Sequence, residues 1–296
     1  APPTPNVVTL PPPRPPPAQR TELLAPSSAG PRGELLPLAV YGALPRLLTF
    51  AENADTLAEL RVVSVRLDPC FPTLDRAARE AGGCMPQVRM VLQPLTLADR
   101  DGQTLLVSAD AAIHTFYELS DDELDLLLRR VVFASREAQA PSADEPLGAH
   151  PVLAAQGLTG PFATALRQAL LDHCGDRNLV RVTFMTSESF GDTWRFGGFD
   201  LQNGALVPMQ VATLESADQV FLNLDLEGQV FDSGAASPAA TVSDDISLFF
   251  DSDFATQTGP AATAMAYQSL LRIEDPRRYR PDTLDCVSCP VAPAPR

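Results

Sequence analysis

Short segments in which apolar and polar residues alternate predict most of the strands in this chain. Alternation places every second side chain on the same face of a sheet, so one face can pack on a core while the other stays polar. Two turn signals, Asp101-Gly102 and Asn203-Gly204, favour hairpins between neighbouring segments. The strand-like segments are residues 60–67, 87–93, 104–108, 179–186, 193–201, 206–212 and 220–226.

A helix is predicted over residues 121–136. Ser120 and Glu123 have the spacing of a capping box, in which the Ser120 hydroxyl accepts from the backbone N–H of Glu123 and the carboxylate reaches back. Acidic residues in the first turn suit the helix dipole, so we interpret them as a cap and not as a metal site. Further helices are expected as a pair after residue 149, interrupted near 160–161 and ending by 175, then over 246–254, and from 260 to before 276.

The order of these elements predicts an α+β fold, with antiparallel sheets and packed helices in two halves. Between the halves, residues 139–149 have the proline-rich and alanine-rich composition of a linker. We therefore expect a proline-rich arm over residues 1–38, an N-terminal domain over 39–138, a C-terminal domain over 150–276 and an irregular tail over 277–296.

Composition disfavours several classes of function. Hydrophobic residues make up 45% of the 296 residues, which is enough for a core, and the net charge of −15 would repel nucleic acid. No run of 18 apolar residues occurs, so no transmembrane segment is expected. All 22 basic residues are arginine, and the absence of lysine excludes Schiff-base chemistry and a P-loop.

Prolines define the N-terminal arm. Residues 1–37 hold 12 of the 29 prolines, and such a segment favours extended polyproline II over helix or sheet. Two interpretations stay open: a disordered spacer, or an arm that lies across a partner subunit. A start at Ala1 with such an arm fits a mature, processed product. The prolines assigned to partner binding are Pro11, Pro12, Pro13, Pro15, Pro16 and Pro17.

Cysteine positions indicate the compartment. Cys70 and Cys84 flank a short polar segment between two predicted strands, and we interpret them as a disulfide that stabilises the fold by about 3 kcal/mol. This pairing places the protein outside the cytoplasm, in the periplasm, with the outer membrane or at the cell surface. Two buried thiols in a reducing compartment are the alternative. Cys174 lies on an apolar helical stripe, which is typical of an inert core thiol.

The three histidines match no metal-binding motif. His114 lies beside aromatic residues, where a hydrogen-bonded structural role is expected, while His150 precedes a predicted helix and His173 lies near the end of one. The chain has neither a His-Glu-x-x-His motif nor a Gly-x-Ser-x-Gly elbow. The turn at residues 99–102 resembles the start of a calcium loop but lacks the later glutamate. No catalytic residue and no metal site are therefore assigned.

Trp194, Arg195 and Phe196 form the densest aromatic stretch of the chain, and Gly197-Gly198 follows directly. Tryptophan and arginine are enriched at interface hot spots, so a partner-binding surface is one interpretation of this stretch. A half-buried strand with a glycine bulge is the other interpretation.

The tail contains the sharpest motif, the pair Cys286 and Cys289. Followed by histidine, a Cys-x-x-Cys pair is the attachment box of c-type haem, but here Pro290 takes that position and cannot serve as an axial ligand. Residues 277–289, and more loosely residues 181–200, resemble uncharacterised secreted lipoproteins of myxobacterial type, some of which carry Cys-x-x-Cys-His. The resemblance implies a secreted, lipoprotein-like protein and no particular activity.

Several pairings of the tail cysteines stay open. Cys286 and Cys289 can form a local disulfide, or one of the two can pair with Cys174 or with another chain. A zinc site would need four ligands, and only two lie close in the sequence. A redox pair usually lies at a helix N-terminus, not in a proline-flanked tail.

These features predict an extracytoplasmic structural or interaction protein, part of an envelope or extracellular assembly with other protein subunits as partners. No catalysis and no cofactor are expected. The alternative is a redox protein or a degenerate c-type haem protein that uses Cys286 and Cys289. A hydrolase assembled in space from scattered Asp, Glu and His residues also stays open.

Overall fold

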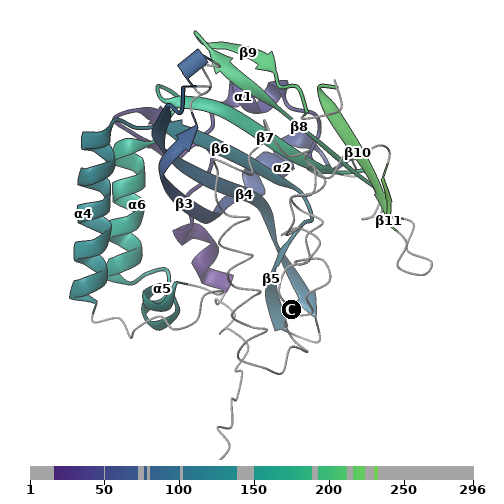
Figure 1. Ribbon diagram of the computed structural model, residues 1–296. Helices are drawn as coiled ribbons and strands as arrows, with labels where there is room; N and C mark the ends of the chain where they lie inside the picture. The colour runs from purple at the N-terminus through teal and green to yellow at the C-terminus, as the bar shows by residue number, and fades with distance from the viewer. Residues whose placement is uncertain are drawn as a thin grey trace, which may run out of the picture.

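One large antiparallel sheet holds together the part of the chain that the structure describes (Figure 1). The structure is a computed structural model, and the residues it describes are 17–49, 51–72, 77–78, 81–100, 103–138, 150–188, 193–211, 216–223 and 230–232. The sheet consists of β3 (Leu60–Pro72), β4 (Cys84–Arg100), β5 (Gln103–Ser108), β6 (Ala112–Glu118), β7 (Leu179–Ser187), β8 (Thr193–Gln202), β9 (Ala205–Pro208), β10 (Asp218–Asn223) and β11 (Val230–Asp232). Its order is β11-β10-β8-β7-β6-β4-β3, with β5 paired to β4 and β9 paired to β8.

Helices pack against this sheet. They are the 3-10 helix η1 (Pro17–Glu22), α1 (Leu38–Ala43), α2 (Asn53–Glu59), α4 (Asp121–Glu137), α5 (Pro151–Gln156) and α6 (Pro161–His173). In Figure 1, α1 and α2 lie behind the sheet, and α4 and α6 stand side by side at the left. The predicted α+β class is confirmed. In the described part of the chain, every helix is too short or too polar to span a bilayer.

Strand alternation sends one set of side chains from each central strand into a common core. On β4, Val88, Met90 and Leu92 are fully buried, and they face Tyr117 and Ile113 of β6 in the register of the two strands. Apolar side chains of α1, α4 and α6 join the same cluster. Each large side chain buried in this way contributes about 1.5–3 kcal/mol, so this face of the sheet is the main source of stability.

The described segment before α1, residues 17–37, belongs to this core and corrects that part of the predicted arm of residues 1–38, whereas residues 1–16 lie outside the described residues. Leu24, Leu35 and Leu36 are buried, although prolines surround them in the sequence. The backbone N–H of Val62 on β3 donates to the carbonyl of Leu24 at 2.8 Å, and the Tyr117 hydroxyl donates to the carbonyl of Leu35 at 2.7 Å. A proline-rich composition predicted an extended arm here, but the leucines between the prolines bury enough apolar surface to fix the segment.

The two predicted halves share one sheet and one core. β6 from the first half pairs with β7 from the second, with Ala112 opposite Met185 and Phe116 opposite Arg181. Residues on both sides of 139–149 enter the same hydrophobic cluster. Residues 139–149 therefore connect α4 and α5 within one unit and do not separate two cores. This corrects the predicted domains 39–138 and 150–276.

Helix α4 begins as its sequence predicts. The Ser120 hydroxyl accepts from the backbone N–H of Glu123 at 3.3 Å, and the Glu123 carboxylate accepts from the backbone N–H of Ser120 at 2.8 Å. Leu124 and Leu127 point into the core, and Arg130 forms an ion pair with Asp172 of the neighbouring α6. The capping box is confirmed, and the predicted end at residue 136 is one residue short.

Asn203 and Gly204 form the turn between β8 and β9. Asn203 and Gly204 have φ of 52° and 79°, the left-handed values that a two-residue hairpin turn with the twist of its strands requires.

Gly197 and Gly198 do not form the predicted bulge, because they pair in regular register with Phe184 and Thr183 of β7. A Cβ on Gly197 would lie 2.7 Å from the Phe184 ring, so glycine is needed for close packing.

Candidate functional site

The sheet face opposite the core carries a row of charged and aromatic side chains. Across β3, β4, β6, β7 and β8, the strand register aligns five residues on this face. Because Val88 and Met90 of β4 point into the core, Arg89 between them points to the opposite side. We call this set the polar row; in order across the sheet it is Arg66, Arg89, Phe116, Arg181 and Asp200.

Asp68 organises one end of the polar row. Its side chain is only 4% exposed, and its two oxygens accept from two different arginines. Arg66 Nε donates to Oδ1 at 2.7 Å, and Arg89 Nε donates to Oδ2 at 2.5 Å. The guanidinium carbon of Arg89 also lies 5.3 Å from the centroid of the Phe71 ring, a cation–π distance. One carboxylate thus ties β3 to β4 and balances one of two positive charges.

Arg181 and Asp200 form the other end of the polar row. Arg181 Nε donates to Asp200 Oδ1 at 2.5 Å, and its Nη2 donates to Oδ2 at 3.1 Å. The Arg181 side chain is 3% exposed and that of Asp200 is 18% exposed. A two-point pair of this kind between β7 and β8 satisfies both charges where little water reaches them.

His114 lies on β6 two residues before Phe116, on the same face of the sheet, and is opposite Thr183 of β7. Its Nδ1 is 3.1 Å from the Thr183 hydroxyl on β7. Burial, together with the positive charge of Arg89 nearby, lowers the pKa of His114 to about 4. The imidazole is therefore neutral at physiological pH, which fits the structural role that the sequence predicted for it.

The low pKa of His114 predicts a loss of stability in acid. The unfolded chain takes up a proton near the ordinary histidine pKa of 6.5, whereas the folded chain does so only near 4. Stability is therefore fully present above about pH 6.5, and about 2–3 kcal/mol of it is lost as the pH falls towards 4. Urea unfolding at about pH 7.5 and about pH 4.5 measures this loss.

A His114→Gln variant supplies the control for this pH dependence. Glutamine keeps a polar group beside Thr183 but cannot take up a proton, so its loss of stability between the two pH values is expected to be smaller by about 2 kcal/mol. Glu118, His150 and His173 titrate in both proteins, so their contributions cancel. Equal losses in the two proteins would contradict the neutral state assigned to His114.

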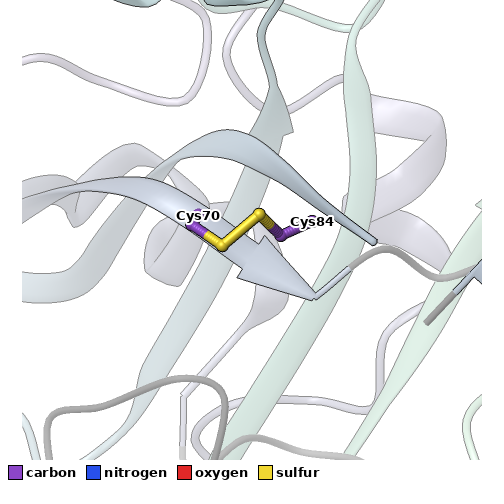
Figure 2. The surroundings of a disulfide bond; sticks show 2 residues. All are labelled: Cys70 and Cys84. Carbon is purple, nitrogen blue, oxygen red and sulfur yellow. A yellow bond between two sulfur atoms is a disulfide. The ribbon is translucent and has the colours of Figure 1, made fainter. Parts of the chain in front are cut away.

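A disulfide closes the end of the hairpin next to Asp68. Cys70 on β3 and Cys84 on β4 are joined, with their Cα atoms 5.0 Å apart, and Figure 2 shows the bond crossing between the two strands. The predicted pairing of these two cysteines is confirmed. Phe71, which follows Cys70 directly, is fully buried and stacks beside Phe116 at a centroid distance of 6.0 Å. The disulfide therefore stabilises the same corner of the sheet as Asp68.

The third described cysteine is part of the core. Cys174 directly follows the last residue of α6 as its C-cap, is fully buried and carries no disulfide. Burial raises the pKa of its thiol far above the usual range, so the reactive thiolate form is suppressed. This placement confirms the predicted core thiol on the helical stripe.

The histidines lie on three different elements. His150 is exposed and precedes α5, where its ring stacks on Phe162 at 4.7 Å, and His173 is the last residue of α6. Burial lowers the pKa of His150 and of His173. Among the described residues, no three His, Cys, Asp or Glu side chains come together in a metal-binding group.

The predicted partner-binding triplet on β8 is divided between the two faces of the strand. Trp194 Nε1 donates to Asp110 Oδ2 at 2.9 Å. Arg195 points to the opposite face, where it forms ion pairs with Glu188 at 2.8 Å and Asp218 at 3.4 Å. Phe196 is buried. The three side chains therefore do not form one continuous surface.

The remaining predicted residues lie mostly outside the described ranges. This holds for Cys286, Cys289 and Pro290 of the tail, and for the turn residues Asp101 and Gly102. Among the prolines assigned to partner binding, only Pro17 is described, as the first residue of η1. The other five lie outside the described residues: Pro11, Pro12, Pro13, Pro15 and Pro16.

Sequence reasoning did not find the polar row. Its members are far apart in the chain and meet only through the strand register. The available signal was a charged residue at a polar position inside several apolar strands, as with Arg89 and Arg181. No protein-family model, no curated protein and no solved structure matches this chain. The function is therefore inferred from the chemistry of its own residues.

Proposed function

We propose that this chain is a structural or interaction protein that works outside the cytoplasm, as part of an envelope or extracellular assembly, without catalysis. The observation that carries this proposal is the Cys70–Cys84 disulfide between β3 and β4. Structural disulfides persist in the periplasm and at the cell surface, whereas the cytoplasm keeps thiols reduced. The compartment inferred from the disulfide fits the predicted envelope or extracellular assembly.

The chemistry of the polar row supports a structural role. Asp68 accepts from two arginines, Asp200 accepts twice from Arg181, and the His114 ring contacts the Thr183 hydroxyl. Apart from the Arg66–Asp68 contact, which lies within β3, each of these contacts joins neighbouring strands of the sheet. Ion pairs between neighbouring strands favour one strand register. A fixed register suits a rigid scaffold that binds partners.

Mass spectrometry of the intact, unreduced protein tests the proposal. The protein is isolated from its native cells after free thiols are blocked, and the same cells are treated with a carboxylate-reactive cross-linker that does not enter the cytoplasm, because the chain has no lysine. We expect a peptide pair linked through Cys70 and Cys84, and cross-links from this chain to another envelope or extracellular protein. Blocked thiols at both positions, or a chain that the cross-linker never reaches, would overturn the proposal. A haem mass on Cys286 or Cys289 would favour the redox alternative instead.

A further inference from the structure

Helix α4 exposes an apolar stripe on the outside of the molecule. Leu126, Val132 and Phe133 are 59%, 44% and 66% exposed. Single exposed apolar side chains are common, but Leu126 and Phe133 are two helical turns apart on the same side of one helix and form the stripe, whereas Val132 points about 100° away from Phe133 around the helix axis. The stripe is therefore a coherent surface.

The other sides of α4 are already occupied. Leu124 and Leu127 pack into the core, and Arg130 pairs with Asp172 of α6. In Figure 1, α4 stands at the outer edge of the molecule, with α6 on its inner side. The exposed stripe thus faces away from the other residues that the structure describes.

Charges along α4 are divided between its two halves. Asp121, Asp122, Glu123 and Asp125 precede the middle of the helix, and Arg129, Arg130 and Arg136 follow it, with Glu137 as the last residue. The exposed residues Asp122, Leu126, Arg129, Phe133 and Arg136 succeed one another at spacings of four, three, four and three, which is the repeat of a coiled-coil seam. The stripe has Asp122 at one end, Leu126 and Phe133 on either side of Arg129 in the middle, and Arg136 at the other end. Arg129 forms an ion pair with Asp125 of the same helix.

We propose that α4 pairs antiparallel with α4 of a second copy of this chain, about a two-fold axis near Arg129. Under this symmetry, Asp122 of each copy faces Arg136 of the other, and Leu126 of each faces Phe133 of the other. A parallel pair would instead place acid against acid and arginine against arginine. Arg129 of each copy lies near the axis, where Asp125 of its own helix balances its charge. The opposite charges at the two ends of the stripe therefore favour a second copy in the antiparallel direction.

This inference rests on the proposed function in one respect, since it names one partner of an interaction protein. Stable interfaces bury about 1,200–2,000 Å² in total, and a single helix pair lies at the low end of that range. We therefore expect a dimer that forms and dissociates with concentration, and not a permanent one.

Sedimentation of the oxidised full-length chain over a concentration series tests the pairing. We expect the mass to rise from that of one chain, 31.7 kDa, towards twice that value. Arg136→Asp places two acids opposite each other at both ends of the interface and is expected to weaken the dimer by at least about tenfold. Asp122→Arg alone is expected to have the same effect, because it creates the reverse repulsion.

The double variant with Asp122→Arg and Arg136→Asp decides the question. It exchanges the two charges, so the antiparallel contact forms again and the dimer is expected to return to within about threefold of the original affinity. The exchange is unfavourable for the α4 dipole, so recovery cannot result from a more stable helix. Circular dichroism confirms that each variant is folded.

Arg46→Asp is the matched control. Arg46 is about half exposed before α2, and its replacement changes the net charge by the same amount as Arg136→Asp without touching α4. The dimer is expected to be unchanged. A single-chain mass at every concentration, a dimer that Arg136→Asp leaves intact, or a double variant that stays monomeric would each overturn the pairing. The outcome is independent of the disulfide measurement, so failure of one proposal does not hide failure of the other.

Discussion

Replacing Cys70 and Cys84 together by serine is expected to lower the free energy of unfolding by about 3 kcal/mol. The disulfide closes a loop with a sequence separation of 14, and opening it restores the freedom of that loop in the unfolded chain. The folded state also loses a constraint beside the buried Phe71 and Asp68, which lie on the same end of β3. Urea unfolding of the oxidised protein and of the double serine variant measures the difference.

Reductant separates the role of the bond from the role of the side chains. A reducing agent is expected to lower the stability of the original protein to about that of the serine variant, and to leave the variant itself unchanged. Cys174 is buried without a disulfide, so its thiol stays the same in both conditions. A protein whose unfolding is indifferent to reductant would contradict the stabilising role of this bond.

Local signals in the sequence were sufficient for the elements whose stability is local. The capping box at Ser120 and Glu123 predicts the start of α4, and Asn203-Gly204 predicts the turn between β8 and β9, because each depends on backbone geometry within a few residues. The Cys70–Cys84 pair was predictable for a similar reason. Both cysteines lie at the ends of predicted strands, close enough in sequence for a hairpin to bring them together.

Elements that depend on distant contacts were missed or left ambiguous. β6 is buried on both faces, so its side chains do not alternate clearly between apolar and polar, and it is not among the strands that the sequence predicts. α1 and α2 have six and seven residues and no side-chain cap, so they carry little local signal. Leu35 is fixed by the hydroxyl of Tyr117, 82 residues away, which no local pattern reports.

The polar row was beyond sequence reasoning for a related reason. Arg89 and Arg181 can be recognised as charged residues within strands, but their alignment depends on the register of β4, β6 and β7. A shift by one residue would turn each of them to the other face of the sheet. The ion pairs with Asp68 and Asp200 are therefore properties of the assembled sheet, and they also help to select its register.

Asp68→Asn is expected to lower the free energy of unfolding by about 3 kcal/mol. The substitution keeps the shape of the side chain but removes its charge and replaces one acceptor oxygen with an amide that can only donate. Arg66 and Arg89 then face each other without the carboxylate that balances them, in a site where Asp68 itself is 4% exposed. The unfolding midpoint in urea measures the change, and a lower midpoint with an unchanged slope indicates that the folded structure is otherwise retained.

Asp125→Asn is the matched control for this variant. It makes the same chemical change in another ion pair, with Arg129 one turn further along α4, but there the aspartate is 58% exposed. Water replaces the lost contact at such a site, so no resolvable shift of the midpoint is expected. The two variants make the same change in charge and size beside the same type of partner, and the sites differ in burial and in the number of arginines, two at Asp68 and one at Asp125. If Asp68→Asn shifted the midpoint no more than Asp125→Asn, the arginines of the polar row would not depend on Asp68, and the ion pairs that join β3 to β4 would be incidental to the stability of the sheet.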